Sequence, residues 1–162
     1  MPRSPKLDLT QAIGFVVNRT AYMMRQLARE TFAELGLALT PEELALLAHL
    51  WQEDGRTQGE LADCSIRDRT TVTRILDRMS KKGLVRREPG RTDRRRVRAW
   101  LTERGKKLEQ TVLPLAGGRL RQLTAGIPPE EMRITLNSLR RIQRNIASAR
   151  LTGGARNGKV RS

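Results

Sequence analysis

The middle of the chain, residues 57–104, constrains the fold more than any other part of the sequence, because its helix and turn signals follow in close order. Thr57 and Glu60 have the spacing of a capping box, which predicts the start of a short helix. Asp68 can cap a second helix, which we expect over residues 69–82. The predicted inner face of this helix consists of Val72, Ile75, Leu76 and Met79. The sequence therefore predicts two helices joined by a tight turn.

Two short segments with strand character follow the second helix. Gly83 is a typical helix stop, and we expect strands over 84–88 and 96–101 with a turn at 89–93. Apolar side chains alternate with arginine and tryptophan along the second segment, so one face of this hairpin should be buried. Five arginines lie near its tip: Arg91, Arg94, Arg95, Arg96 and Arg98. Helix, turn, helix and basic hairpin in this order predict a winged helix-turn-helix, in which one helix can enter a DNA major groove.

The charge of the chain points to the same kind of partner. Lysine and arginine number 32 against 17 acidic residues, and the formal net charge is +15. The excess is greatest within residues 67–104 rather than in a tail, so a polyanion is expected, and nucleic acid is the commonest polyanion. A basic proteome that places arginine on every surface is the alternative explanation of the total charge.

The composition argues against an enzyme, a membrane protein and a secreted protein. The chain has one histidine, one cysteine (Cys64), no glycine-rich phosphate loop and no metal-ligand spacing, so we expect no catalytic residue, no cofactor and no metal. It has no signal peptide and no apolar run of about 20 residues, which predicts a soluble, cytoplasmic protein. At the end of a short helix, a packed and inert Cys64 is favoured over a redox-active thiol.

The first turns of the helix at 69–82 carry side chains suited to reading DNA. Arginine can pair with guanine, and threonine can contact thymine through its methyl group or a base or phosphate through its hydroxyl. The candidates are Arg69, Thr70, Thr71, Thr73 and Arg74. In the wing, over 89–96, the long cations Arg91, Arg94 and Arg95 can enter a minor groove or straddle phosphates. A solvated helix face and a merely soluble basic loop are the alternatives.

Amphipathic helices flank this core on both sides. We expect one helix from about Leu9 to Leu35 and another behind the capping box of Thr40 and Glu43. The predicted buried face of that second helix consists of Leu44, Leu47, Ala48 and Trp51. After the hairpin, we expect a helix capped by Thr102 and kinked or shifted at Pro114, and a last helix ending near residue 151.

The outer helices carry more apolar surface than the central core needs. Packing them across a two-fold axis would bury that surface, and a palindromic DNA site needs such a dimer. The two recognition helices would then lie about 34–36 Å apart. Folding of the outer helices back onto the monomer is the alternative.

An ordered series of motifs resembles the MarR-type transcriptional regulators. The matching segments are Asp68-Arg69-Thr70-Thr71-Val72-Thr73-Arg74, Asp77-Arg78, Lys82-Gly83-Leu84-Val85, Asp93-Arg94-Arg95 and Leu101-Thr102. The match is dense over about 50 residues, and the flanking helices agree in number and order. The resemblance predicts a mainly α fold with a DNA-binding lobe at 37–101, a dimerisation lobe at 1–36 and 102–151, and a disordered tail at 152–162.

The resemblance also implies a function. It implies a homodimer that represses, less often activates, nearby genes, and a small effector, often an aromatic or phenolic acid, that binds between the dimer helices and the DNA-binding lobe. It assigns Thr70, Thr71, Thr73 and Arg74 to the major groove and Arg94 and Arg95 to the wing. Arg67 departs from the family, which usually has a small apolar residue there, and is either an extra phosphate contact or the sign of a turn shifted by one residue.

The effector-binding residues are the least specified part of this expectation. The candidates are Tyr22, Met23, Arg25, His49 and Trp51. Arg25 could pair with a carboxylate, whereas methionine and tryptophan at such positions belong more often to a core, and His49 lies off the apolar face. The sequence names neither the operator, the genes, the sign of regulation nor the effector.

Two other nucleic-acid functions remain open from the sequence. Single-stranded RNA readers usually offer aromatic stacking platforms, and of five aromatic residues only Trp100 lies on the basic hairpin. A non-specific DNA binder would share the steep salt dependence without a sequence preference. We expect Arg94→Ala to weaken binding to all DNA, and Thr71→Val or Arg74→Ala to change the preferred sequence.

Overall fold

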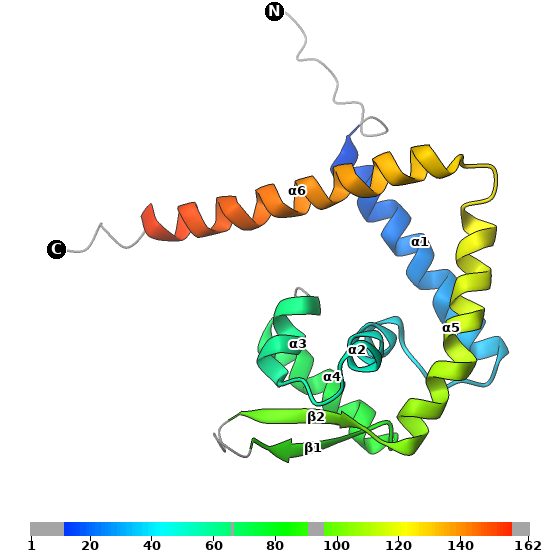
Figure 1. Ribbon diagram of the computed structural model, residues 1–162, viewed down its shortest axis with the longest axis vertical. Coiled ribbons are helices and arrows are strands. Elements are labelled where there is room, and N and C mark those ends of the chain that lie inside the picture. The colour runs from blue at the N-terminus through cyan, green and yellow to red at the C-terminus, as the bar shows by residue number, and fades with distance from the viewer. Residues whose placement is uncertain (1–11, 66, 91–95, 157–162) are drawn as a thin grey trace, which may run out of the picture. The chain divides into compact units, whose positions relative to one another are not determined.

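The fold is described from a computed structural model, which describes residues 12–65, 67–90 and 96–156 (Figure 1). The chain divides into two units, Met1–Val112 and Leu113–Ser162. Its helices and strands in chain order are α1 (Ile13–Glu34), α2 (Pro41–Gln52), α3 (Gln58–Ser65), α4 (Arg69–Lys81), β1 (Val85–Pro89), β2 (Val97–Leu101), α5 (Glu103–Leu123) and α6 (Pro129–Arg156). The predicted mainly helical fold with one hairpin is confirmed.

The predicted starts of α2, α3 and α4 are confirmed, and each depends on local hydrogen bonds. The predicted start of the first helix near Leu9 lies outside the described residues. Thr40 and Glu43 form a complete capping box at α2. Thr57 and Glu60 form the same reciprocal pair before α3, with Thr57 N donating to Glu60 Oε2 at 2.7 Å. Asp68 caps α4. These contacts satisfy backbone groups at helix starts that would otherwise lack a partner.

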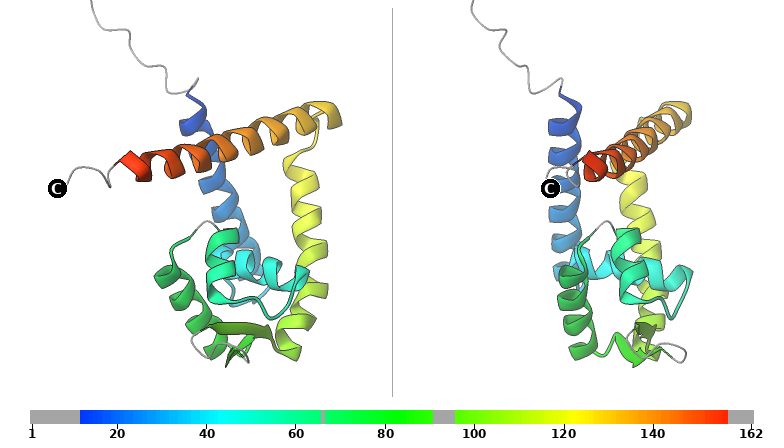
Figure 2. Two further views of the ribbon diagram at one scale, coloured as in Figure 1. Left: turned by 60° about the vertical axis from the view of Figure 1, so that its left-hand side comes forward. Right: turned by 90° about the vertical axis from the view of Figure 1, so that its left-hand side faces the viewer.

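The core of the first unit lies between α2, α3, α4 and the hairpin. Figure 2 shows this group from two further sides. The buried apolar residues are Leu46, Leu47, Leu50, Leu61, Ala62, Val72, Ile75, Leu76, Met79, Leu84, Val85, Ala99 and Leu101. The four predicted inner residues of α4 are all among them, so the predicted periodicity of that helix is confirmed.

The predicted buried face of α2 is wrong in phase. Leu47 is fully buried as predicted, but Leu44, Ala48 and Trp51 are only half-buried. The other fully buried residues of α2 are Glu43, Leu46 and Leu50. Helix α2 contacts α3, α4 and β2, and the residues of α2 that face these elements are the ones that are buried. Because leucine occupies both possible stripes, periodicity alone could not choose between them.

The hairpin lies one residue later than predicted at each strand's start. Strands β1 and β2 pair antiparallel, with Val85 opposite Leu101 and Pro89 opposite Val97. Gly90 N donates to Arg96 O at 2.7 Å at the tip end of the described ladder. Thr57 forms an isolated antiparallel bridge with Arg98, so β2 is paired on both edges at that point.

Helix α5 passes through Pro114 as one element. The boundary between the two units falls between Val112 and Leu113, directly before this proline. Proline cannot donate to the carbonyl four residues earlier, so the helix lacks one backbone bond there. Helix α6 continues to Arg156, five residues beyond the predicted end at 151, and residues 157–162 lie outside the described part. Across the described ranges, no helix is both long and apolar enough to span a bilayer.

Candidate nucleic-acid interface

Asp68 fixes the first turn of α4 through two hydrogen bonds with Thr71. Thr71 N donates to Asp68 Oδ1 at 2.8 Å, and Thr71 Oγ1 donates to Asp68 Oδ2 at 2.6 Å. These hydrogen bonds lower the pKa of Asp68. The cap therefore holds a carboxylate at the helix N-terminus, where negative charge is favourable.

The three threonines of this turn differ in how their hydroxyl groups are used. Thr71 donates its proton to the cap, and Thr73 Oγ1 donates to Arg69 O at 2.8 Å. Thr70 is exposed, and its hydroxyl has no hydrogen bond with any described residue. Thr70 therefore keeps both its donor and its acceptors for an outside partner, a distinction that residue type alone could not give.

Two arginines of α4 lie on its outer face. Arg69 and Arg74 are exposed, whereas Val72 and Ile75 point into the core. Arg67, in the turn before the helix, is half-buried, and its backbone N–H donates to Ala62 O at 3.0 Å. Burial alone would raise the pKa of Glu42, but hydrogen bonds at the α2 N-terminus and the positive charges of Arg29 and Arg67 lower it overall. The charge of Arg67 is thus partly used within the protein.

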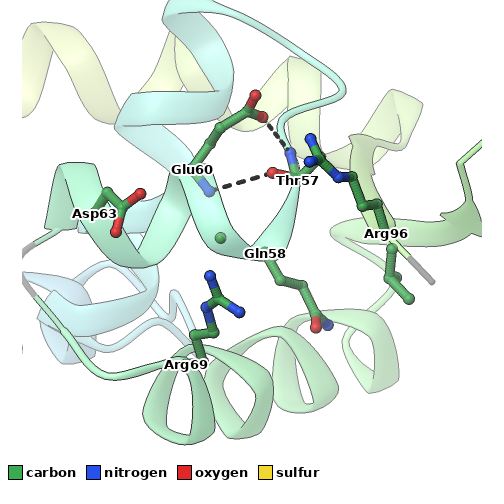
Figure 3. A pocket seen from close by; sticks show the side chains of 8 residues that line it. Thr57, Gln58, Glu60, Asp63, Arg69 and Arg96 are labelled. Carbon is green, nitrogen blue, oxygen red and sulfur yellow. Dashed lines mark hydrogen bonds between the residues drawn. The ribbon is translucent and has the colours of Figure 1, made fainter. Parts of the chain in front are cut away.

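A polar cavity of about 380 Å³ opens between α3, α4 and the wing (Figure 3). It is lined by Thr57, Gln58, Gly59, Glu60, Asp63, Arg69, Arg96 and Val97. In Figure 3 the side chains of Arg69 and Arg96 reach toward the first turn of α3 from two sides, while Glu60 turns toward Thr57. A β-carbon added to Gly59 would lie 3.8 Å from Arg69 Nη2, so the guanidinium lies close to the α3 backbone. Two cations and a helix N-terminus thus meet at one opening.

The described arginines of the wing have mixed roles. Arg98 Nη1 donates to Gly55 O at 2.6 Å, and Arg87 pairs with Asp77 of α4. The guanidinium of Arg86 lies 5.7 Å from the ring centroid of Trp100 and pairs with Glu88. Arg96 is exposed at the start of the wing. Arg98, which the sequence grouped with the tip, therefore fastens β2 to the turn after α2. Arg91, Arg94 and Arg95 lie outside the described residues.

The turn after α2 holds the wing at its base. Asp54 Oδ1 accepts hydrogen bonds from Gly55 N at 2.9 Å and from Leu101 N at 2.8 Å. Gly55 has φ of +74°, and a β-carbon there would lie 2.4 Å from the Trp100 ring. Only glycine fits this position, because both the backbone angle and the ring exclude a side chain. The contact of this turn with β2 does not follow from the sequence, because Asp54 and Leu101 lie 47 residues apart.

The candidate effector residues are scattered over α1 and α2. Tyr22 and Met23 are more than half exposed, and Arg25 and His49 are half-buried. Trp51 packs against the core, and its indole N–H donates to Gly105 O at 3.0 Å. These contacts favour a role for Trp51 in the core over a role in effector binding. A second cavity, of about 310 Å³, is lined by 36–39, Lys82, Leu84, Arg104 and Leu108. None of the five candidates lines either of these two cavities.

Cys64 is half-buried at the end of α3, and its thiol donates to Leu61 O at 3.5 Å. Burial raises the pKa of Cys64. Since the thiolate is the reactive form, this environment favours the packed, inert thiol expected from the sequence.

A capped helix with an exposed polar face, a preceding helix and a fastened basic hairpin define a winged-helix DNA-binding protein of the transcription-regulator class. The sequence matches the model of the MarR family over residues 39–97. The HTH-type transcriptional regulator YsmB of Bacillus subtilis is 31% identical over 140 residues, which cover 86% of this chain and 94% of YsmB. The chain belongs to the MarR family.

Solved structures share this fold over most of their length. The S. aureus MepR–DNA complex superposes with a TM-score of 0.74 at 24% identity, covering 82% of this chain and 96% of MepR. BpsR of Bordetella bronchiseptica superposes with a TM-score of 0.73 at 20% identity, covering 82% of this chain and 99% of BpsR. The DNA binding of BpsR is described as regulated by 6-hydroxynicotinic acid. The expected fold and family are confirmed.

Proposed function

We propose that this protein is a homodimeric, sequence-specific transcriptional regulator whose α4 reads the major groove of a palindromic operator. The observation that carries the proposal is the division of α4 into a buried apolar face and an outer face with Arg69, Thr70 and Arg74. The free hydroxyl of Thr70 and the guanidinium group of Arg74 supply hydrogen bonds of the kind that distinguish base edges. Thr71 and Thr73 then serve mainly through their methyl groups, because their hydroxyl protons are donated within the helix.

The cavity between α3, α4 and the wing is proposed to lie over the DNA backbone. Arg69 and Arg96 flank its opening, and the first turn of α3 adds backbone N–H groups, a combination that suits a phosphate. Hydrogen bonds from Thr57 lower the pKa of Glu60 and turn its carboxylate toward the cap rather than the opening. In this proposal Arg91, Arg94 and Arg95 of the wing reach the minor groove or the neighbouring phosphates.

The dimer is supported by apolar side chains that the single chain leaves exposed. On α1 these include Ile13, Val16, Val17, Met23 and Met24, and on α6 they include Ile134, Leu136 and Ile146. Isolated exposed apolar residues are ordinary, but so many on two long helices are typical of a surface that a second copy covers. The assignment of residues 1–36 and 102–151 to a dimerisation lobe is part of this proposal, because it presupposes a dimer.

Repression relieved by a small aromatic or phenolic acid is the proposed mode of control, in the cytoplasm. The support is by similarity: the fold neighbour BpsR is described as regulated in DNA binding by 6-hydroxynicotinic acid. Among the candidate residues, half-buried Arg25 carries the charge that an acid would need. The absence of a catalytic role for the protein is part of the same proposal.

Two substitutions in α4 test the reading of bases. Thr70→Val removes a free hydroxyl while keeping the side-chain shape, and Arg74→Ala removes an exposed guanidinium. Each should change which duplexes are enriched from a randomised library, with a loss of about 1–3 kcal/mol on the wild-type site. The matched control is Lys81→Ala, which removes an exposed charge from the far end of the same helix and should leave the ranking of sequences unchanged. If Thr70→Val and Arg74→Ala both left the ranking of sequences unaltered, the result would contradict the proposal.

A further inference from the structure

A fully buried carboxylate joins α2 to the end of α4. Glu43 is 0% exposed, and Lys82, the C-cap of α4, donates from Nζ to Glu43 Oε1 at 2.8 Å and to Oε2 at 2.7 Å. Thr40 N donates to Oε2 at 2.9 Å, and Arg78 Nε lies 3.8 Å from Oε1. The capping box of α2 and the last turn of α4 therefore share one carboxylate.

Lys82 also contacts the loop that precedes α2. Its Nζ donates to Ala38 O at 2.7 Å, so Glu43 Oε1, Glu43 Oε2 and Ala38 O take up the three donors of the ammonium group. The side chain of Lys82 is 31% exposed, so the ion pair is only partly screened by water. One lysine thus joins the α1–α2 loop, α2 and α4.

The apolar contacts between α2 and α4 do not fix the angle of α4 by themselves. Apolar contacts are non-directional, and neighbouring arrangements of the same side chains bury similar areas. An ion pair with three short hydrogen bonds accepts only a narrow set of positions, and such pairs can select one arrangement among several. From these contacts we infer that the Glu43–Lys82 pair is a positioning device, which sets the orientation of α4 and thereby the sequence preference of the protein.

The length of α4 makes its orientation sensitive to its C-terminal end. At a rise of 1.5 Å per residue, Arg69 lies about 18 Å along the helix from Lys81. A tilt of about 5° about the C-terminal end would move the base-reading turn by about 1.5 Å, which exceeds the tolerance of about 0.5 Å that a recognition geometry allows. Contacts with the DNA backbone tolerate the same shift better, because phosphates lie all along the strand.

The test compares specific with non-specific binding in matched variants, and it rests on the proposed sequence-specific function. The variants are Lys82→Met and the isosteric Glu43→Gln, and the control is Lys81→Met, which removes the neighbouring exposed lysine. The probes are the duplex that the wild-type protein enriches from a random library and a scrambled duplex of equal composition. Binding is measured at one salt concentration and at a temperature where circular dichroism shows each variant folded.

The expected result is a loss of sequence preference without an equal loss of affinity for DNA in general. For Lys82→Met and Glu43→Gln, the specific Kd should rise about tenfold and the scrambled Kd less than about threefold. For Lys81→Met, both should rise by the same factor. Lys82→Arg, which keeps the charge, should recover part of the preference that Lys82→Met loses.

Every other outcome would contradict either the positioning role of the Glu43–Lys82 pair or the proposed sequence-specific function. Folded Lys82→Met and Glu43→Gln proteins with a specific-to-scrambled ratio within about twofold of Lys81→Met would overturn the positioning role. Failure of both variants to fold would show the pair to be required for the fold, and would also overturn it. A wild-type protein without any sequence preference would instead contradict the proposed function.

Discussion

Asp68 is the residue whose ionisation most directly affects α4. Its pKa is held below the ordinary value of an aspartate by hydrogen bonds from the side chain and the backbone of Thr71. A carboxyl whose pKa is lower in the folded than in the unfolded chain stabilises the fold above the unfolded pKa, and this stabilisation is lost as the pH falls through the folded pKa. The contribution of the cap is therefore present at neutral pH and lost in acid.

Asp68→Asn tests this sign, because asparagine also caps helices but carries no charge. The urea midpoint of the wild type should exceed that of Asp68→Asn at pH 6, and the difference should shrink as the pH falls from about 5 to below the folded pKa. Urea titrations of both proteins across this range give the measurement. A difference that stays constant, or grows, in acid contradicts the assigned role of the carboxylate.

Gly105 is the second residue at which a small change should have a large effect. A β-carbon there would lie 2.2 Å from Leu84 O, in the backbone that joins α4 to β1. Gly105→Ala should lower the free energy of unfolding by about 1–3 kcal/mol, since the first turn of α5 must move away. Gly14→Ala is the control: nothing lies within 4 Å of its added β-carbon, and it should change stability by less than about 1 kcal/mol. Equal effects of the two substitutions would contradict the close approach of α5.

At the scale of the element, the sequence predicted what depends on local signals. The capping boxes of α2 and α3, the Asp68 cap and the inner face of α4 follow from residues three or four positions apart. The phase of α2 did not follow, because leucines occupy both faces and contacts with α3, α4 and β2 decide which is buried. The sequence likewise did not show that Arg98 fastens β2 to the turn after α2, since its partner Gly55 lies 43 residues away.

The wing is the element whose placement depends most on a single turn. Asp54→Ala removes the acceptor of Leu101 N and Gly55 N, and should lower the free energy of unfolding by about 1–3 kcal/mol. The loosened hairpin should also be cut faster by trypsin between Arg86 and Arg98. The control Glu53→Ala removes a neighbouring acid that is itself largely exposed and pairs with half-buried Arg56, and it should cost less than about 1 kcal/mol. An unchanged cleavage rate in Asp54→Ala would show that the wing does not depend on this turn.

At the scale of the whole molecule, the sequence predicted the need for a partner but not its contacts. The apolar stripes of the outer helices exceed what one copy buries, as the exposure of Met23 on α1 and of Ile134 and Ile146 on α6 indicates. In the proposed dimer, the contacts among these side chains depend on the second copy, so neither periodicity nor a single chain specifies them. The same holds for the proposed effector site, whose candidates Tyr22, Met23 and Arg25 lie on α1.

A matched pair of substitutions on α6 tests the dimer. Ile146→Asp places a charge on a half-exposed apolar position, whereas Gln143→Asp places the same charge on an exposed polar position of the same helix. Ile146→Asp should shift the protein toward monomer and weaken operator binding, because burying an unpaired carboxylate is costly. Sedimentation equilibrium across a dilution series measures this. Identical assembly of the two variants would place Ile146 outside the interface.

Selection of bound duplexes from a randomised library, at near-physiological salt, is the decisive test of whether this protein reads DNA sequence as a dimer. A dimeric reader of DNA sequence should enrich a palindrome whose half-sites lie about one helical turn apart, roughly 10–10.5 base pairs. Strong binding that enriches no motif would contradict the claim, because contacts with phosphates alone give affinity without preference.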